Sequence, residues 1–143
     1  MKKAQQIFDF LPGKWSITRN FISLPQSLHK THIALGHATF TASEDDSNLL
    51  LYSEKITMSD SIIGTQEYSY RYDEINHSLS KYFSDGRLFY IIDTSNGKAS
   101  GYHLCIKDIY KSEYIFDNDQ FSITYFITGP SKNCKIITKY TKT

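Results

Sequence analysis

The chain has 143 residues, and its 16 basic residues almost balance its 15 acidic ones, for a formal net charge of +1. This length suits one domain around one core, and we expect residues 1–143 to form it. A nucleic-acid-binding groove usually needs a basic excess on one face, so no nucleic-acid partner is predicted. Aromatic residues make up 15% of the chain, with 11 Tyr and 9 Phe, and this composition favours β-structure.

The cysteine content and the hydropathy pattern bear on location. Cys105 and Cys134 lie far apart in the sequence and define no disulfide framework. The start, Met1-Lys2-Lys3, is followed by an amphipathic segment that carries Asp9, not by the apolar run of a secretion signal. No stretch approaches the roughly 20 apolar residues of a membrane span. We therefore expect a cytoplasmic protein with reduced thiols and no membrane partner.

The predicted elements begin with a short helix over 4–11, which Pro12-Gly13 ends. Short β-rich runs separated by turn signals then predict ten strands: 13–22, 31–41, 48–57, 61–72, 77–84, 87–93, 99–107, 110–116, 120–128 and 133–141. Asp85-Gly86 between two such runs predicts a tight hairpin in which both central residues have positive φ. Gly129-Pro130 predicts another turn before the last strand.

This pattern predicts the fold class. No long helix-period segment interrupts the strands, which argues against parallel βαβ units. Strands joined by short turns can close into a barrel, which removes both sheet edges, and a barrel of this size can hold one small ligand. We therefore predict an all-β protein, a single antiparallel up-and-down β-barrel of eight to ten strands with a short N-terminal helix. A bulge near Gly36 or within 108–110 would invert the inward and outward faces that follow it.

Two resemblances support the barrel. Gly13-Lys14-Trp15, opening the first strand after a short helix, resembles the G-x-W segment of lipocalins in the calycin superfamily. That resemblance implies that the Trp packs at the closed end of the barrel, under a basic residue from near the last strand. Lys139 or Lys135 is the expected basic residue in this chain.

The second resemblance covers nearly the whole chain. It is carried by these segments: Phe10-Leu11-x-Gly13-x-Trp15 with Arg19, Gly36-x-Ala38-x-Phe40, Tyr52-x-Glu54, Arg71-Tyr72, Phe83-x-Asp85-Gly86-Arg87-x-Phe89, His103-x-Cys105-x-x-Asp108-x-Tyr110 and Gly129-Pro130-x-Lys132. Together they resemble an uncharacterised family of small lipocalin-like proteins, similar in fold to fatty-acid-binding proteins. The chain departs from that family at Tyr90, where His is usual, and at Lys142, where Arg is usual. The resemblance implies a fold but no activity.

Three charged residues share a strand face with apolar neighbours: Arg19 with Trp15 and Ile17, Glu54 with Tyr52 and Ile56, and Arg87 with Phe89 and Ile91. An inward-facing Arg is costly unless it is paired or solvated. One interpretation is that Arg19 and Arg87 bind an anionic or polar ligand group, as a bidentate Arg can. The alternative is structural: Arg19 pairs with Glu54, and Arg87 bonds only its own turn.

His103-x-Cys105 places an imidazole and a thiol on one strand face. Such a pair can supply a Cys nucleophile or metal ligands, but two ligands are too few for a structural zinc site, and no metal is predicted. His103 could instead act as a general acid–base beside Glu54 or Tyr125. The other histidines, at positions 29, 32, 37 and 77, are expected to be exposed. A haem would need one histidine as its axial ligand, and nothing else in the sequence indicates haem, so no cofactor is predicted.

Three functional hypotheses follow. The first is a barrel that binds a small, partly apolar ligand, lined by Arg19, Glu54, Arg87, His103, Cys105 and Tyr125, while Gly13, Trp15, Asp85, Gly86, Gly129 and Pro130 have structural roles. The second is a small lyase, isomerase or hydrolase that uses His103 with Glu54 or Tyr125. The third is a filled barrel that binds another protein through an apolar patch, sought in the loop over 23–30. The sequence does not determine the ligand or the oligomeric state.

Overall fold

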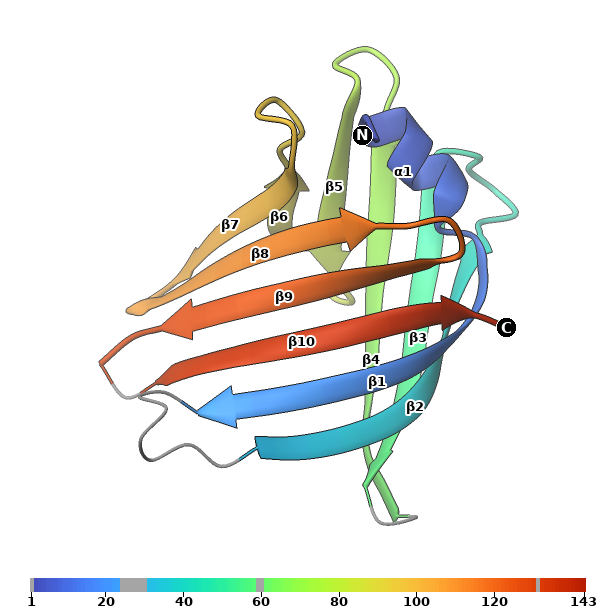
Figure 1. Ribbon diagram of the computed structural model, residues 1–143. Coiled ribbons are helices and arrows are strands. Elements are labelled where there is room, and N and C mark those ends of the chain that lie inside the picture. Colours follow the sequence, from blue (N-terminus) through green and yellow to red (C-terminus); the bar gives the residue numbers. More distant parts are fainter. Residues whose placement is uncertain (1, 24–30, 59–60, 131) are drawn as a thin grey trace.

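The computed structural model describes residues 2–23, 31–58, 61–130 and 132–143. In this part of the chain one short helix precedes ten strands (Figure 1). Their bounds are α1 (Ala4–Phe10), β1 (Gly13–Ser23), β2 (Thr31–Ala42), β3 (Leu49–Met58), β4 (Ser61–Asp73), β5 (Ser78–Phe83), β6 (Leu88–Ile92), β7 (Ala99–Cys105), β8 (Asp108–Phe116), β9 (Gln120–Thr128) and β10 (Asn133–Lys142). These elements match the predicted helix and strands and differ from them only at the ends.

The strands form one antiparallel meander in the order β6-β5-β4-β3-β2-β1-β10-β9-β8-β7. Because β1 pairs with both β2 and β10, the first and last strands lie side by side in the middle of the sheet. The sheet curls until its two outer strands meet at one bridge, where the Asp93 N–H donates to the Ser100 carbonyl at 2.7 Å and the Ser100 N–H to the Asp93 carbonyl at 3.0 Å. The predicted all-β barrel is therefore confirmed.

The closure differs from the expected complete ladder. Beyond the Asp93–Ser100 bridge, β6 and β7 are not paired within the described residues, so the barrel is nearly closed. The Tyr90 ring lies at this seam against Gly101, where an added Cβ would meet the ring at 2.2 Å. Side-chain packing thus joins the two strands where ladder hydrogen bonds do not.

The turn between β5 and β6 corrects one detail of the prediction. Gly86 has φ +91°, but Asp85 does not have positive φ. The Gly86 N–H donates to the Phe83 carbonyl at 3.0 Å, and the Phe83 N–H donates to the Arg87 carbonyl at 2.9 Å. A turn followed by a left-handed glycine, rather than a two-residue loop, therefore connects the strands.

Helix α1 lies across one end of the barrel, beside the ends of β4 and β5 (Figure 1). It buries Ile7 and Phe8, and Leu11 directly after it is also fully buried. The Trp15 indole donates to the Leu11 carbonyl at 2.9 Å, which ties the first strand to the end of the helix. We call this the closed end of the barrel.

The basic residue at the closed end is not the expected one. Lys142, whose Cα pairs with that of Trp15, holds its ammonium 4.4 Å from the Trp15 ring and donates to the Pro12 carbonyl at 2.6 Å. Lys139 is exposed, and Lys135 lies over Phe126, so both expectations are wrong. The reason is the register of β10 on β1, which places Lys142 beside Trp15.

The core at the closed end is aromatic. Phe121 lies against Trp15 with ring centres 4.9 Å apart, and it stacks on Tyr140 with centres 4.3 Å apart. Phe40 and Phe10 complete this cluster, Phe10 coming from α1. Edge and stacked contacts of this kind stabilise more than burial alone, so the closed end is densely packed.

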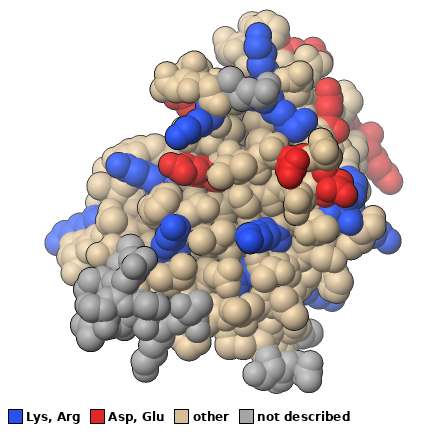
Figure 2. Space-filling model, viewed as in Figure 1, with Lys and Arg blue, Asp and Glu red and all other residues tan. Residues whose placement is uncertain are grey.

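The surface carries charges of both signs. On the face shown in Figure 2, basic and acidic side chains are interspersed, with acidic groups gathered at the upper right, and no continuous basic stripe is visible on that face. Within the described residues, no helix has the length and hydrophobicity that a membrane-crossing helix needs.

Candidate functional site

A cavity of about 610 Å³ occupies the half of the barrel opposite α1. Its wall is mainly apolar and aromatic and includes Phe21, Ile56, Tyr68, Phe83, Phe89, Tyr110, Ile127 and Ile136. Its polar lining includes the six residues predicted from the sequence, namely Arg19, Glu54, Arg87, His103, Cys105 and Tyr125. A cavity of this size argues against the hypothesis of a filled barrel.

Arg19 and Glu54 face the interior, as their alternation with Trp15 and Tyr52 predicts, and they bind each other. The two Arg19 terminal nitrogens donate to the two Glu54 oxygens at 2.7 and 2.9 Å, and Arg19 Nε donates to the Thr138 hydroxyl at 2.7 Å. Burial disfavours the charged guanidinium, but the Glu54 hydrogen bonds and charge outweigh it and raise the pKa of Arg19. Arg19 and Glu54 therefore form the internal ion pair predicted from the sequence as the alternative to ligand binding by Arg19.

The Glu54 carboxylate has a second partner. The Tyr52 hydroxyl donates to Glu54 Oε1 and lies 2.8 Å from the Tyr140 hydroxyl. Burial and the nearby Glu54 charge raise the pKa of Tyr52, so this phenol stays protonated. Since both carboxylate oxygens are occupied, Glu54 holds Arg19 as a neutral pair within the cavity wall.

The remaining charge in the interior is Lys81, on β5, which is not among the six residues predicted from the sequence. Only 4% of its surface is exposed, and its ammonium donates to the Tyr125 hydroxyl at 2.8 Å. The ammonium lies 4.0 Å from the centre of the Tyr68 ring. Among the described residues, no carboxylate lies within ion-pair distance of it.

The alternation of residues along β5 predicts that the Lys81 side chain faces the barrel interior. Leu79, Lys81 and Phe83 alternate with Ser80 and Tyr82, so they share a strand face. Leu79 is fully buried and Phe83 lines the cavity. Lys81 therefore meets the criterion that predicts inward-facing Arg19 and Glu54, namely a charged residue on the same strand face as apolar residues.

Burial controls the chemistry of Lys81. Desolvation among aromatic rings lowers its pKa from 10.5 to about 7, with Glu54 acting in the opposite direction and Arg19 reinforcing the decrease. An ordinary exposed Lys is almost fully protonated at neutral pH, whereas this one is divided between its ammonium and amine forms. Lys81 is thus both a potential cation and a potential nucleophile.

A chain of phenol hydroxyls extends from Lys81 into the core. The Tyr125 hydroxyl lies 2.7 Å from that of Tyr90, which is hydrogen-bonded to Tyr114. Burial raises the pKa of all three phenols, so they remain protonated at neutral pH. These hydrogen-bonded phenols can polarise one another or relay a proton toward Lys81, and they add no charge to the site.

Three other predicted residues lie at the solvent end of the cavity. His103 is half-buried, with its ring centre 5.1 Å from that of Phe89, and Cys105 is exposed. Arg87 is exposed and donates to Asp85 at 2.8 Å, so it bonds its own turn. These residues form the rim of the cavity.

The predicted face shared by Arg87, Phe89 and Ile91 is wrong at Ile91, which is 54% exposed, while Tyr90 and Ile92 are buried. The register between β5 and β6 shifts at Lys81 and Tyr82. A bulge leaves one residue unpaired and changes the side to which later side chains point.

The predicted acid–base pair is not assembled. His103 makes no hydrogen bond to Glu54 or Tyr125, because Glu54 is held by Arg19 and Tyr52, and the Tyr125 hydroxyl is held by Lys81 and Tyr90. His32, His37 and His77 are exposed, as expected. His29 and the loop over 24–30 lie outside the described residues.

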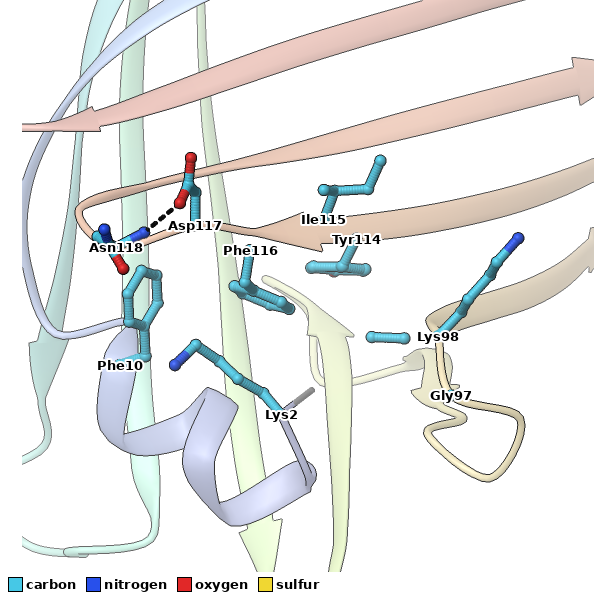
Figure 3. A pocket seen from close by; sticks show the side chains of 10 residues that line it. Lys2, Phe10, Gly97, Lys98, Tyr114, Ile115, Phe116, Asp117 and Asn118 are labelled. Carbon is cyan, nitrogen blue, oxygen red and sulfur yellow. Dashed lines mark hydrogen bonds between the residues drawn. The ribbon is translucent and has the colours of Figure 1, made fainter.

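A second hollow of about 520 Å³ lies on the surface at the closed end, between α1 and the end of β8 (Figure 3). Phe10 and Phe116 meet there with ring centres 5.5 Å apart, and the Lys2 ammonium lies 4.6 Å from the Phe10 ring. Figure 3 shows Lys98 pointing away from this group. In contrast to the barrel cavity, this hollow contains no buried charged side chain.

Metal ligands are not gathered in the part of the chain that the structure describes, where no group of three His, Cys, Asp or Glu side chains is placed to hold an ion. Cys105 and Cys134 are free thiols, and burial raises the pKa of Cys134. The barrel cavity with Lys81 is therefore the candidate functional site.

With this geometry established, comparison with known proteins identifies the family. Residues 11–142 match the family of unknown function DUF6314. The chain belongs to this family. No match was found among curated proteins.

One similar solved structure adds evidence on the fold. This DUF6314 chain is similar to the S-type phycobiliprotein lyase CPES from Guillardia theta, with a TM-score of 0.76 and 9% identity over 99% of this chain and 93% of that one. It also matches a redesigned β-barrel at a TM-score of 0.47 and 14% identity, over 94% of this chain and 93% of the design. At 9% identity the lyase shows a shared barrel fold and nothing about shared chemistry.

Proposed function

We propose that the barrel binds one small, partly apolar molecule in the cavity opposite α1, with the polar or anionic end of that molecule at Lys81. The observation that carries the proposal is a buried Lys that faces an aromatic cavity with no carboxylate partner among the described residues. Burying a cation without a counter-charge is costly, and a bound anionic group would supply that charge.

The cavity fits such a ligand in size and polarity. Its volume of about 610 Å³ lies within the usual range for small-molecule sites, which are mostly apolar with a few placed polar groups. Phe89 and Tyr125 stack in parallel with ring centres 6.0 Å apart and provide flat walls for an unsaturated or aromatic body. The phycobiliprotein lyase supports the proposal only through its similar barrel fold.

In this proposal Lys81, rather than Arg19, binds the polar or anionic end of the ligand. The Glu54 carboxylate already neutralises Arg19, so a ligand anion would have to displace an internal partner. Lys81 offers an unpaired charge with hydrogens free for a ligand oxygen, because Tyr125 accepts one of its three. His103, Cys105 and Arg87 are proposed to contact the outer end of the ligand.

Two fluorescent probes with the same ring system test this function. 8-Anilinonaphthalene-1-sulfonate is anionic, and N-phenyl-1-naphthylamine is its neutral counterpart. We expect both to bind the full chain, with Lys81→Met weakening the anionic probe roughly tenfold or more, the effect of losing one charge-assisted hydrogen bond. The neutral probe should change by less than about twofold, because only the charge contact is lost.

Lys55→Met is the matched control, since Lys55 is an exposed lysine on β3. It should change the affinity for neither probe. Failure of both probes to bind, or loss of the anionic probe equally in both variants, would overturn the proposed function.

A further inference from the structure

The Lys81 side chain has the surroundings of a reactive amine. Its Nζ reaches the cavity, and its protein hydrogen-bond partner is the neutral Tyr125 hydroxyl. Aromatic rings from three strands surround it: Tyr68 on β4 at 4.0 Å, Phe89 on β6 at 5.5 Å and Tyr125 on β9 at 5.4 Å. These rings exclude water without providing a counter-charge, which favours the uncharged amine.

The charged and titratable groups that face Lys81 are few. Glu54 on β3 favours the ammonium and Arg19 on β1 disfavours it, and the two largely offset each other as an ion pair. The phenols of Tyr68, Tyr70, Tyr90 and Tyr125 stay protonated, because burial raises the pKa of each. His103 and Tyr110 line the same cavity from β7 and β8. Desolvation therefore dominates the state of Lys81.

The consequence is a large fraction of free amine at neutral pH. With its pKa lowered to about 7, Lys81 is unprotonated in about half of the molecules at pH 7. A lysine of ordinary pKa is unprotonated in only about one molecule in three thousand. Enzymes that attack carbonyl groups with lysine use the same desolvation to activate the amine.

We propose that Lys81 forms a reversible imine with an aldehyde or ketone that enters the barrel cavity. This inference rests on the proposed ligand-binding function and specifies the reactive group of the ligand, a carbonyl on an apolar or aromatic body. The aromatic walls would hold the body, and the carbonyl carbon would lie at Nζ. Among the described residues, no other lysine is buried.

The reaction balances without an oxidant or a reductant. The Nζ lone pair forms a bond to the carbonyl carbon, and the C=O π electrons move to the oxygen, which takes up a proton while the nitrogen loses one. The resulting carbinolamine loses its hydroxyl group together with an added proton as water while the nitrogen lone pair forms the C=N bond, and the nitrogen then releases its remaining proton to give the neutral imine. Hydrolysis reverses each step.

Tyr125 is placed to move the protons. Its hydroxyl lies 2.8 Å from Lys81 Nζ and 2.7 Å from the Tyr90 hydroxyl, so it can give a proton to the departing oxygen and regain one along the phenol chain. Since Tyr125 touches the reacting nitrogen, we assign it as the proton donor of this step. Tyr125→Phe keeps the ring and removes only the hydroxyl.

Reductive trapping of a small aromatic aldehyde tests the inference. The full chain is incubated with 2-naphthaldehyde, which has no alkene that a thiol can attack, at pH 7, reduced with sodium borohydride and weighed by intact-protein mass spectrometry. We expect one addition equal to the mass of the aldehyde less one oxygen atom, located on Lys81 by peptide mapping. Lys81→Met should abolish this fast addition, Lys55→Met should not affect it, and Tyr125→Phe should slow it roughly tenfold or more.

The pH profile provides a second readout. Labelling of Lys81 should fall as pH drops below 7, where its amine becomes protonated, whereas labelling of exposed lysines should keep rising toward pH 10. Addition spread over exposed lysines and unchanged in Lys81→Met would overturn the imine.

Binding of N-phenyl-1-naphthylamine separates the two proposals. If this neutral probe binds but 2-naphthaldehyde leaves no label on Lys81, the imine is wrong and the binding function stands. If neither the probe binds nor the label forms, both are wrong. If the label forms and excess probe suppresses it, the reaction takes place in the cavity and both are supported.

Discussion

The two halves of the barrel interior contain similar residues but use them differently. At the closed end, Trp15, Phe40 and Phe121 pack ring against ring, and none of the three lines the cavity. At the other end, Phe83, Phe89 and Tyr125 are also aromatic, but they line a cavity of about 610 Å³. Composition alone therefore does not separate a packed core from a binding site.

Charge separates the two halves. At the closed end, Lys142 lies on the outside over Trp15, where water reaches it. The cavity half encloses Arg19, Glu54 and Lys81, of which only the first two are paired. Buried unpaired charge opposes folding, so its presence at one end points to a function for that end. Four predictions test this comparison, in order of decreasing effect.

The largest difference should come from removing one aromatic ring at each end. Phe121→Ala at the closed end should lower the free energy of unfolding by about 3–5 kcal/mol, the usual cost of a cavity in a packed core. Phe83→Ala should lower it by roughly 1–2 kcal/mol, because Phe83 is half-buried and already borders empty space. Urea unfolding of both variants measures this contrast, and equal losses would show that the two halves are packed alike.

The Arg19–Glu54 pair should behave as a structural unit. Glu54→Leu leaves the Arg19 guanidinium buried without its partner and should lower the free energy of unfolding by about 3–5 kcal/mol. The double variant Arg19→Met with Glu54→Leu should lose markedly less, since no unpaired charge remains. Chemical denaturation of the single and double variants gives the coupling energy, and a double variant as unstable as the single one would contradict this account.

Lys81 should make stability depend on pH. Its pKa is about 7 in the folded chain and near 10.5 when unfolded, so between these values the unfolded chain binds more protons and stability rises with pH. The stability advantage of Lys81→Met over wild type should be greatest below pH 7 and shrink by about 2 kcal/mol between pH 7 and pH 9.

Unfolding curves of wild type and Lys81→Met at several pH values measure this difference. The tyrosines are common to both proteins, so their titration cancels in the comparison. Lys55→Met should show no such trend. A difference that does not vary with pH would mean that Lys81 keeps an ordinary pKa in the folded chain.

The smallest effect concerns Lys142 at the closed end. Lys142→Met removes the ammonium over the Trp15 ring and its hydrogen bond to the Pro12 carbonyl, which should cost about 0.5–1 kcal/mol. Lys139→Met, on the same strand but exposed, should change stability by no more than a few tenths of a kcal/mol. Thermal unfolding compares the two, and an equal response would remove any special role for Lys142.

Local sequence patterns predicted much of this protein. Alternation and turn residues located the ten strands and the short helix, because the two-residue period and the turn glycines depend on neighbouring residues alone. The same alternation placed Arg19 and Glu54 inside the barrel, and the short spacing of the strands indicated a meander that closes. Strand alternation also places Lys81 on the inward face with Leu79 and Phe83, although Lys81 is not among the six predicted site residues.

Other features of the protein follow only from the tertiary structure, because they depend on strand register and on contacts across the barrel. Strand alternation does not say that Arg19 meets Glu54, that Lys142 rather than Lys139 lies over Trp15, or that a register shift turns Ile91 outward. Nor does it distinguish a packed half from a hollow one. The empty volume beside Lys81 is set by side chains from every strand except β2, and these side chains meet only when the sheet has curled. That is why the reactive amine is defined by the fold rather than by a motif.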